Sequence, residues 1–167
     1  MRVAVYPGSF DPPTCGHHDI IKRASAIFDK VYVTVFSNPD KKSTFSGEER
    51  VEMLSCMTRD LENVLVERYY GLLTDYVRSR KASIIVRGMR AVSDFDYEFS
   101  MALLNQKLAP EVHTIFIMTN PDYLYLSSSK VKELASFGAC VRGLVPPNVE
   151  ARLRIRFGRQ DDSGEGL

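Results

Sequence analysis

The stretch VAVYPGSFDPPTCGH, residues 3–17, decides the fold class of this 167-residue chain. Residues 3–6 form a short apolar run, as in a buried strand, and Pro7-Gly8 end it. From His17 to Phe28 the apolar residues recur at helical spacing, so a helix follows the loop. The β-branched and aromatic run KVYVTVF, residues 30–36, predicts a second strand. Strand, helix and strand in this order indicate a βαβ unit.

The same alternation continues to residue 157. We predict further strands over residues 64–66, 82–86 and 113–118, and further helices over residues 46–57, 72–80, 94–108, 128–138 and 149–157. Five strands alternating with helices indicate one α/β domain, residues 1–157, with a parallel sheet covered by helices on both faces. Residues 158–167, GRQDDSGEGL, have almost no apolar content, which predicts a disordered tail.

Composition excludes several classes of protein. Lysine and arginine number 22 against 21 acidic residues, so the chain lacks the basic excess of a typical nucleic-acid binder. No apolar run approaches the roughly 18–20 residues that span a bilayer, so we expect no membrane segment. The three cysteines are far apart and the N-terminus does not resemble a signal peptide. We therefore expect a cytoplasmic protein without a disulfide framework.

Three segments at the predicted carboxyl ends of strands, where such sheets bind ligands, could bind phosphate. In the first loop, Ser9 and His17 lie near a helix N-terminus, which attracts anions. Arginines in the RGMR segment, residues 87–90, could clamp phosphates with forked donors. The serines of YLYLSSS, residues 123–129, could cap a helix and present donors. The ordinary alternatives are a tight turn, a solvated surface loop and simple helix capping.

The combination Gly8-Ser9-Phe10-Asp11-Pro12 with Thr14-x-Gly16-His17 resembles the first signature of the nucleotidyltransferase superfamily that carries a [T/H]-x-G-H motif. Together with RGMRA at 87–91 and SSSKVK at 127–132, it resembles the bacterial phosphopantetheine adenylyltransferase family over residues 3–153. The resemblance implies a Rossmann-like five-stranded sheet. It also implies adenylyl transfer from ATP to 4′-phosphopantetheine, with Mg²⁺, by direct attack without a covalent intermediate.

The resemblance also assigns roles to residues. His17 is the expected catalytic residue, stabilising the transition state at the α-phosphate. The implied phosphopantetheine contacts are Ser9, Lys41, Leu73 and Arg87. The implied ATP contacts are Ser9, Phe10, His17, Gly88, Met89, Arg90, Glu98, Tyr123, Leu124, Tyr125, Leu126, Ser127, Ser128 and Ser129. No metal ligand is assigned. The family further implies a homohexamer and feedback inhibition by coenzyme A. From the charge balance and the absence of a long apolar run we expect neither nucleic acid nor a membrane as a partner.

Other interpretations stay open at this point. The acceptor could be nicotinate mononucleotide or glycerol 3-phosphate. A nucleotide sensor without catalysis would lack one of the charged groups needed for transfer, whereas His17, Lys41, Arg87 and Arg90 are all present. An RNA-binding relative of the aminoacyl-tRNA synthetases is disfavoured by the balanced charge and the short chain. Among single residues, Lys41 could be a solvated surface lysine, Leu73 a core residue and Glu98 a solvated helical carboxylate.

Overall fold

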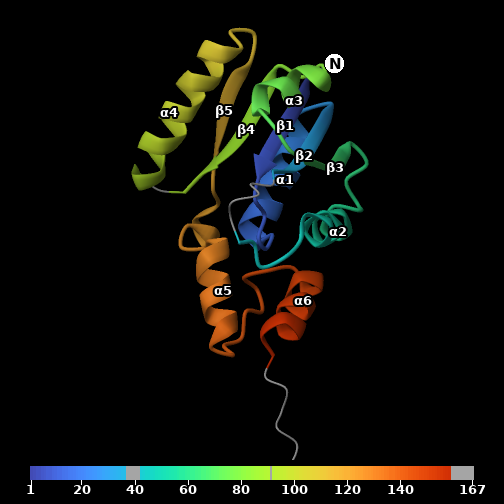
Figure 1. The fold of residues 1–167 in the computed structure, drawn as a ribbon, viewed down its shortest axis with the longest axis vertical. Coiled ribbons are helices and arrows are strands. Elements are labelled where there is room, and N and C mark those ends of the chain that lie inside the picture. The colour runs from blue at the N-terminus through green and yellow to red at the C-terminus, as the bar shows by residue number, and fades with distance from the viewer. Residues whose placement is uncertain (37–41, 91, 159–167) are drawn as a thin grey trace, which may run out of the picture.

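The computed structural model describes residues 1–36, 42–90 and 92–158 of the chain. A parallel sheet with the strand order β3-β2-β1-β4-β5 forms its centre (Figure 1). The strands are β1 (Val3–Gly8), β2 (Lys30–Phe36), β3 (Val64–Tyr69), β4 (Ile84–Met89) and β5 (His113–Met118). The helices are α1 (Cys15–Ile27), α2 (Gly47–Met57), α3 (Leu73–Ser79), α4 (Val92–Leu108), α5 (Ser128–Ser136) and α6 (Pro147–Phe157), with a short 3₁₀ helix η1 (Pro121–Tyr123).

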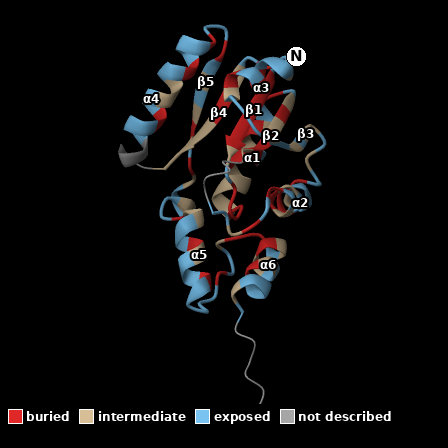
Figure 2. Cartoon of the chain, viewed as in Figure 1, coloured by how far each residue is buried: buried red, intermediate tan, exposed pale blue. Residues whose placement is uncertain are grey.

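Side chains alternate between the two faces of the sheet, and each face has its own apolar core. Ala4 and Tyr6 of β1 pack with Ile21 of α1 on one face. Val3 and Val5 pack on the other face, together with residues from α3 and from the segment that follows α4. The buried strands between the more exposed outer surfaces of the helices are visible in Figure 2. The expected α/β architecture with helices on both faces is therefore confirmed.

Helices α5 and α6 form a third cluster beyond the carboxyl ends of the strands, below the sheet in Figure 1. Phe45 and Met53, from the loop before α2 and from α2 itself, pack into this cluster with Val149 and Leu153 of α6. α5 and α6 thus enclose the space beyond the strand ends. The chain order reverses between β1 and β4, and ligands of open α/β sheets bind at such a point.

The predicted boundaries hold for β2 and β5 but were wrong for β4. β4 runs from Ile84 to Met89 instead of residues 82–86, because it pairs with β5 as far as Met89 and Met118. Arg87, Gly88 and Met89 therefore belong to the strand and do not follow it as a loop. None of the described helices has both the length and the apolar character that a membrane span requires.

Candidate active site

A cleft of about 450 Å³ lies at the carboxyl ends of β1 and β4. Its walls come from the first loop, the start of α1, β4, α4 and the segment that leads into α5. The predicted residues that line it are Ser9, Phe10, His17, Arg87, Gly88, Arg90, Glu98, Tyr123, Leu126, Ser127, Ser128 and Ser129. All three phosphate-binding segments expected from the sequence therefore meet in one cavity.

His17 is held by the cap of its own helix. Thr14 is the N-cap of α1, and its side chain accepts the His17 backbone N–H. The backbone N–H of Thr14 donates in return to Nδ1 of His17 over 3.0 Å. Because Nδ1 accepts this hydrogen bond, the neutral imidazole carries its proton on Nε2. Burial, followed by the positive charges of Arg90 and Arg87, lowers the pKa of His17 from 6.5 to about 4. His17 is thus a neutral hydrogen-bond donor at pH 7.

Arg87 joins three elements of the site. Its guanidinium is bidentate with the Glu98 carboxylate of α4, with a distance of 2.7 Å from Nε to Oε2. Its third nitrogen donates to the carbonyl oxygen of Pro7 in β1 over 3.0 Å. Glu98 is 9% exposed and Arg87 is partly buried, so solvent screens the pair only weakly. Three hydrogen bonds therefore fix the orientation of this arginine in the cleft wall.

The serine segment is tied to the other two segments. The Arg90 guanidinium donates to the carbonyl oxygen of Leu126 over 2.8 Å. Ser128 donates through its hydroxyl to the carbonyl oxygen of Pro12, also over 2.8 Å. Ser127 caps α5 and accepts the backbone N–H of Lys130. The positive end of the α5 dipole therefore faces the cleft, where it favours an anion.

A smaller cavity of about 100 Å³ adjoins the cleft. Arg87, Tyr97 and Glu98 line both spaces. Leu73, the first residue of α3, lies in this smaller cavity, and the remaining walls are Met101, Ala102, Asn105 and Thr114. The larger space is thus rich in charged and hydroxyl groups, whereas the wall of the smaller one is partly apolar, through Leu73, Met101 and Ala102.

Several expected residues do not line the cleft. Met89 is in β4 but is not part of its wall, and Leu124 and Tyr125 are exposed on the surface. Lys41 lies outside the described residues, as does most of the predicted disordered tail. The structure adds wall residues to which the sequence had assigned no contact, among them Tyr6, Thr14, Tyr97 and Thr119. The sequence contained a signal for two of them: Thr14 is at a helix N-cap, and Thr119 directly follows the end of a strand. Tyr97 had none.

The carboxylates near the cleft are already engaged by the protein. Both oxygens of Asp11 accept backbone N–H groups, from Thr44 and Phe45, and one of them also accepts Lys132 Nζ. Glu98 is paired with Arg87. Within the part of the chain that the structure describes, no three His, Cys, Asp or Glu side chains gather to hold a metal ion. These residues do not form a metal site made of protein ligands alone.

The comparisons with known proteins agree with this geometry. The sequence model of the cytidylyltransferase-like family matches residues 5–134. The phosphopantetheine adenylyltransferase of Clostridium novyi is 54% identical over 159 residues, which cover 95% of this chain and 99% of that protein. The phosphopantetheine adenylyltransferase of Caldanaerobacter subterraneus is 55% identical over 157 residues, covering 94% and 98%.

A solved structure supports the fold. The bifunctional NMN adenylyltransferase/ADP ribose pyrophosphatase of Francisella tularensis, complexed with AMP and a manganese ion, superposes with a TM-score of 0.67 at 19% identity, over 92% of this chain and 49% of that one. At this identity the likeness concerns the fold alone. The identity to the curated relatives is far higher and extends over nearly the whole chain. The chain therefore belongs to the phosphopantetheine adenylyltransferase family of cytidylyltransferase-like proteins.

Proposed function

We propose that the protein transfers the adenylyl group of ATP to 4′-phosphopantetheine, giving 3′-dephospho-coenzyme A and pyrophosphate. Membership of an adenylyltransferase family supports the reaction. One observation supports this cleft as the place of the reaction. Three segments suited to bind anions meet there around His17, a neutral N–H donor. Nicotinate mononucleotide and glycerol 3-phosphate are less suitable acceptors, because the adjoining cavity has a partly apolar wall that fits a pantetheine arm.

The reaction proposed here needs no general base. A 4′-phosphate oxygen, already ionised at pH 7, attacks the α-phosphorus of ATP from the side opposite the leaving group. The new P–O bond forms as the bond to the β-phosphate bridging oxygen breaks, and pyrophosphate leaves with that electron pair. No covalent enzyme intermediate is required. The contribution of the protein is to align two anions that repel each other and to stabilise the charge around the α-phosphorus.

The described residues divide this work between the two substrates. We assign the α-phosphate to His17, whose Nε2–H donates to an oxygen that gains charge in the transition state. Arg90 and the serines of the α5 N-terminus suit the β- and γ-phosphates. Arg87 and Ser9 suit the acceptor phosphate, as does Lys41 by family resemblance. The fixed pairing with Glu98 keeps the Arg87 fork in one orientation.

The magnesium ion is assigned to the substrate. The carboxylates of Asp11 and Glu98 are already used by N–H, ammonium and guanidinium donors. We therefore propose that Mg²⁺ enters as the MgATP complex, with phosphate oxygens and water as its main ligands, as this ion prefers. Its contribution is to neutralise the charge of the leaving pyrophosphate.

We also propose that the chain assembles as a homohexamer. Large apolar side chains are exposed along α4 and the edge strand β5, and no described element covers them: Phe95, Phe99, Leu103, Leu104, Leu108, Ile115 and Met118. The rings of Phe95 and Phe99 stack at 5.4 Å. An apolar surface of this extent is typical of a face that meets another protein chain.

Coenzyme A carries the same pantetheine arm and would compete for the cleft as a feedback inhibitor. We retain the cytoplasm as the expected location.

Pyrophosphate release tests the proposal. Purified protein would receive ATP and Mg²⁺ with 4′-phosphopantetheine, nicotinate mononucleotide or glycerol 3-phosphate in parallel reactions. Release with 4′-phosphopantetheine alone is the expected result. Release with only one of the other acceptors would overturn the assignment of the small cavity, and ATP binding without release would favour a sensor. A His17→Ala variant, purified in the same way, controls for a contaminating activity.

A further inference from the structure

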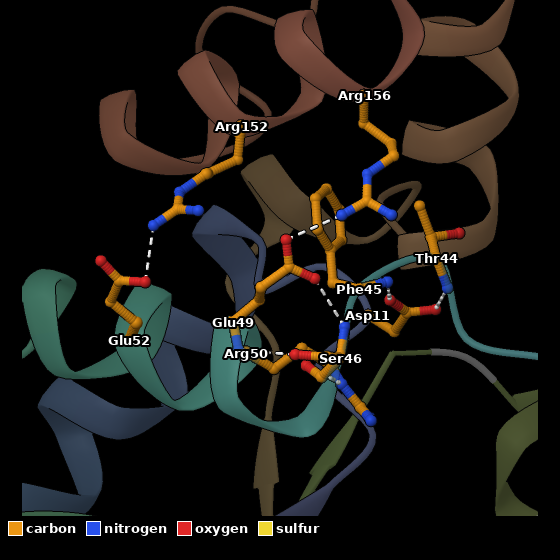
Figure 3. Close-up of polar contacts among 9 residues, drawn as sticks. All are labelled: Asp11, Thr44, Phe45, Ser46, Glu49, Arg50, Glu52, Arg152 and Arg156. Atoms are coloured by element: carbon orange, nitrogen blue, oxygen red, sulfur yellow. Dashed lines mark hydrogen bonds and ion pairs between the residues drawn. The ribbon is translucent and has the colours of Figure 1, made fainter.

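Arg50 is a buried cation that has no role in the reaction as assigned so far. It lies in the first turns of α2 and is only 3% exposed. Its Nε donates to the carbonyl oxygen of Ser46 over 3.1 Å, within its own helix (Figure 3). A terminal guanidinium nitrogen donates to the carbonyl oxygen of Ser9 over 2.7 Å, across 41 positions of sequence. Burying a charge is costly unless its hydrogen-bond donors have partners. The first loop must therefore keep the Ser9 carbonyl oxygen within hydrogen-bond distance of Arg50.

The peptide unit that Arg50 holds joins two residues of the cleft wall, Ser9 and Phe10. This peptide is trans, so its carbonyl oxygen and its N–H point in opposite directions. With the Ser9 carbonyl directed at Arg50, the Phe10 N–H is directed away from α2. Arg50 thus sets the orientation of one backbone donor beside the cleft.

The conformation of Phe10 shows that this orientation must be imposed by its surroundings. Phe10 has a φ of 48°, a left-handed conformation that a bulky side chain rarely adopts. Its ring is buried between the rings of Tyr6 and His17, with centroid distances of 5.4 and 5.0 Å. The ring also lies against Gly8, where an added Cβ would come within 2.8 Å. Such a conformation persists only when several contacts determine it together.

Asp11 secures the other side of the same loop. Its carboxylate accepts the backbone N–H groups of Thr44 and Phe45, both at 2.9 Å, just before α2 begins (Figure 3). Burial lowers the pKa of Arg50, and the negative charge of Asp11 opposes that effect. The N-terminal region of α2 therefore holds the loop at two points, but only Arg50 acts directly on the peptide between Ser9 and Phe10.

We infer that Arg50 is a positioning residue for adenylyl transfer, which fixes the peptide between Ser9 and Phe10 so that its N–H and the Ser9 hydroxyl meet the substrate phosphates in the cleft. Arg50 does not touch the substrates itself. The inference rests on the proposed function, because it needs phosphate groups in this cleft. It separates Arg50 from Arg152 and Arg156 of α6, which form ion pairs with Glu52 and Glu49 of α2.

Arg50→Met and Arg50→Lys test the inference. Methionine keeps the length of the side chain and removes the donors, so we expect kcat/KM for ATP to fall by about 100-fold, the order expected for misplaced reacting groups. Lysine keeps the charge but cannot reach both carbonyl oxygens at once, so a fall of about tenfold is expected. Arg152→Gln is the matched control, because it removes a solvent-exposed ion pair between α6 and Glu52 of α2, the helix that carries Arg50. It should keep wild-type kinetics.

The readouts separate positioning from simple stability. Assays are run well below the melting temperature of each variant, and ATP affinity is measured separately by calorimetry without acceptor. Folded Arg50→Met with wild-type kinetics and wild-type ATP affinity would overturn the inference. If Arg50→Met does not fold, Arg50→Lys decides, and unaltered kinetics in that variant would overturn it equally. Absence of turnover in the wild-type protein would overturn the proposed function instead. The ATP affinities of the variants would then still test whether Arg50 positions the loop.

Discussion

The backbone N–H of Thr14 donates to Nδ1 of His17 over 3.0 Å, and this contact fixes which ring nitrogen carries the proton. The contact belongs to the capping box of α1, in which the third helical residue is a histidine where glutamate or glutamine is usual. One interaction therefore begins the helix and prepares a hydrogen-bond donor. The two roles are separable by experiment. Another side chain can replace His17 in the helix cap, whereas few side chains can supply a donor in the place of its Nε2–H.

His17→Ala should lower kcat by about 100- to 1,000-fold, the loss typical for one donor that stabilises transition-state charge. ATP affinity should change little, because the interaction strengthens mainly as charge develops at the α-phosphate. Steady-state kinetics combined with calorimetric ATP binding provide the test. Equal losses in binding and in rate would show that His17 holds the ground state as well.

The pH dependence of stability should carry a contribution from His17. Its pKa is about 4 in the folded protein, below the 6.5 of an unperturbed histidine, because burial and two arginines disfavour the cation. Between these values the unfolded chain binds more protons, so stability falls as the pH drops from about 6.5 to about 4. The contribution is up to about 3 kcal/mol. Urea unfolding at pH 7 and pH 4.5 measures it, and His17→Asn should show a smaller difference between the two.

Glu98→Gln should weaken both stability and acceptor binding. The amide cannot neutralise Arg87 or accept both of its donors, which leaves a largely buried cation poorly paired. Because Arg87 retains 28% side-chain exposure, the expected cost in unfolding free energy is about 1–3 kcal/mol, below that of a fully buried pair.

The KM for 4′-phosphopantetheine should rise with the loss of a fixed Arg87. Glu52→Gln removes the exposed partner of Arg152 and is the control, expected to stay within about 0.5 kcal/mol of wild type. A wild-type KM in Glu98→Gln would indicate that Arg87 keeps its orientation through Pro7 alone.

Leu104→Glu should disrupt the proposed assembly. Leu104 is 56% exposed in the apolar surface of α4, and a carboxylate buried between two chains would be costly. Light scattering should report a smaller species than the hexamer proposed for the wild-type protein. Ile155→Glu, at an 82% exposed position of α6 away from that surface, should leave the mass unchanged (Figure 1). An unchanged mass in Leu104→Glu would move the interface to another face.

Local patterns in the sequence predicted the fold and much of the cleft wall. The run of residues 30–36 and the capping box of Ser46 with Glu49 match the structure, because nearest neighbours determine both. Pairing across the fold was not predictable in the same way. The end of β4 depends on its partner Met118, which no local pattern in residues 82–90 reveals.

The contacts that orient the site are mostly long-range. Glu98 looks like a solvated helical carboxylate until the topology brings it to Arg87. Lys132 and Asp11 are 121 positions apart, and Arg50 reaches Ser9 across 41. Local sequence patterns identified many of the residues that line the cleft, whereas the residues that hold them in place became visible only in three dimensions.

The hydroxyl of Ser128 donates to the carbonyl oxygen of Pro12, so the last cleft segment in the chain closes onto the first. During synthesis on the ribosome, the βαβ unit at the N-terminus emerges long before the segment that contains Ser128. The wall of the cleft is therefore complete only after residue 129 has left the exit tunnel. A truncated product that ends before η1 would carry His17 and both arginines, yet it would lack the serine segment that completes the cleft wall.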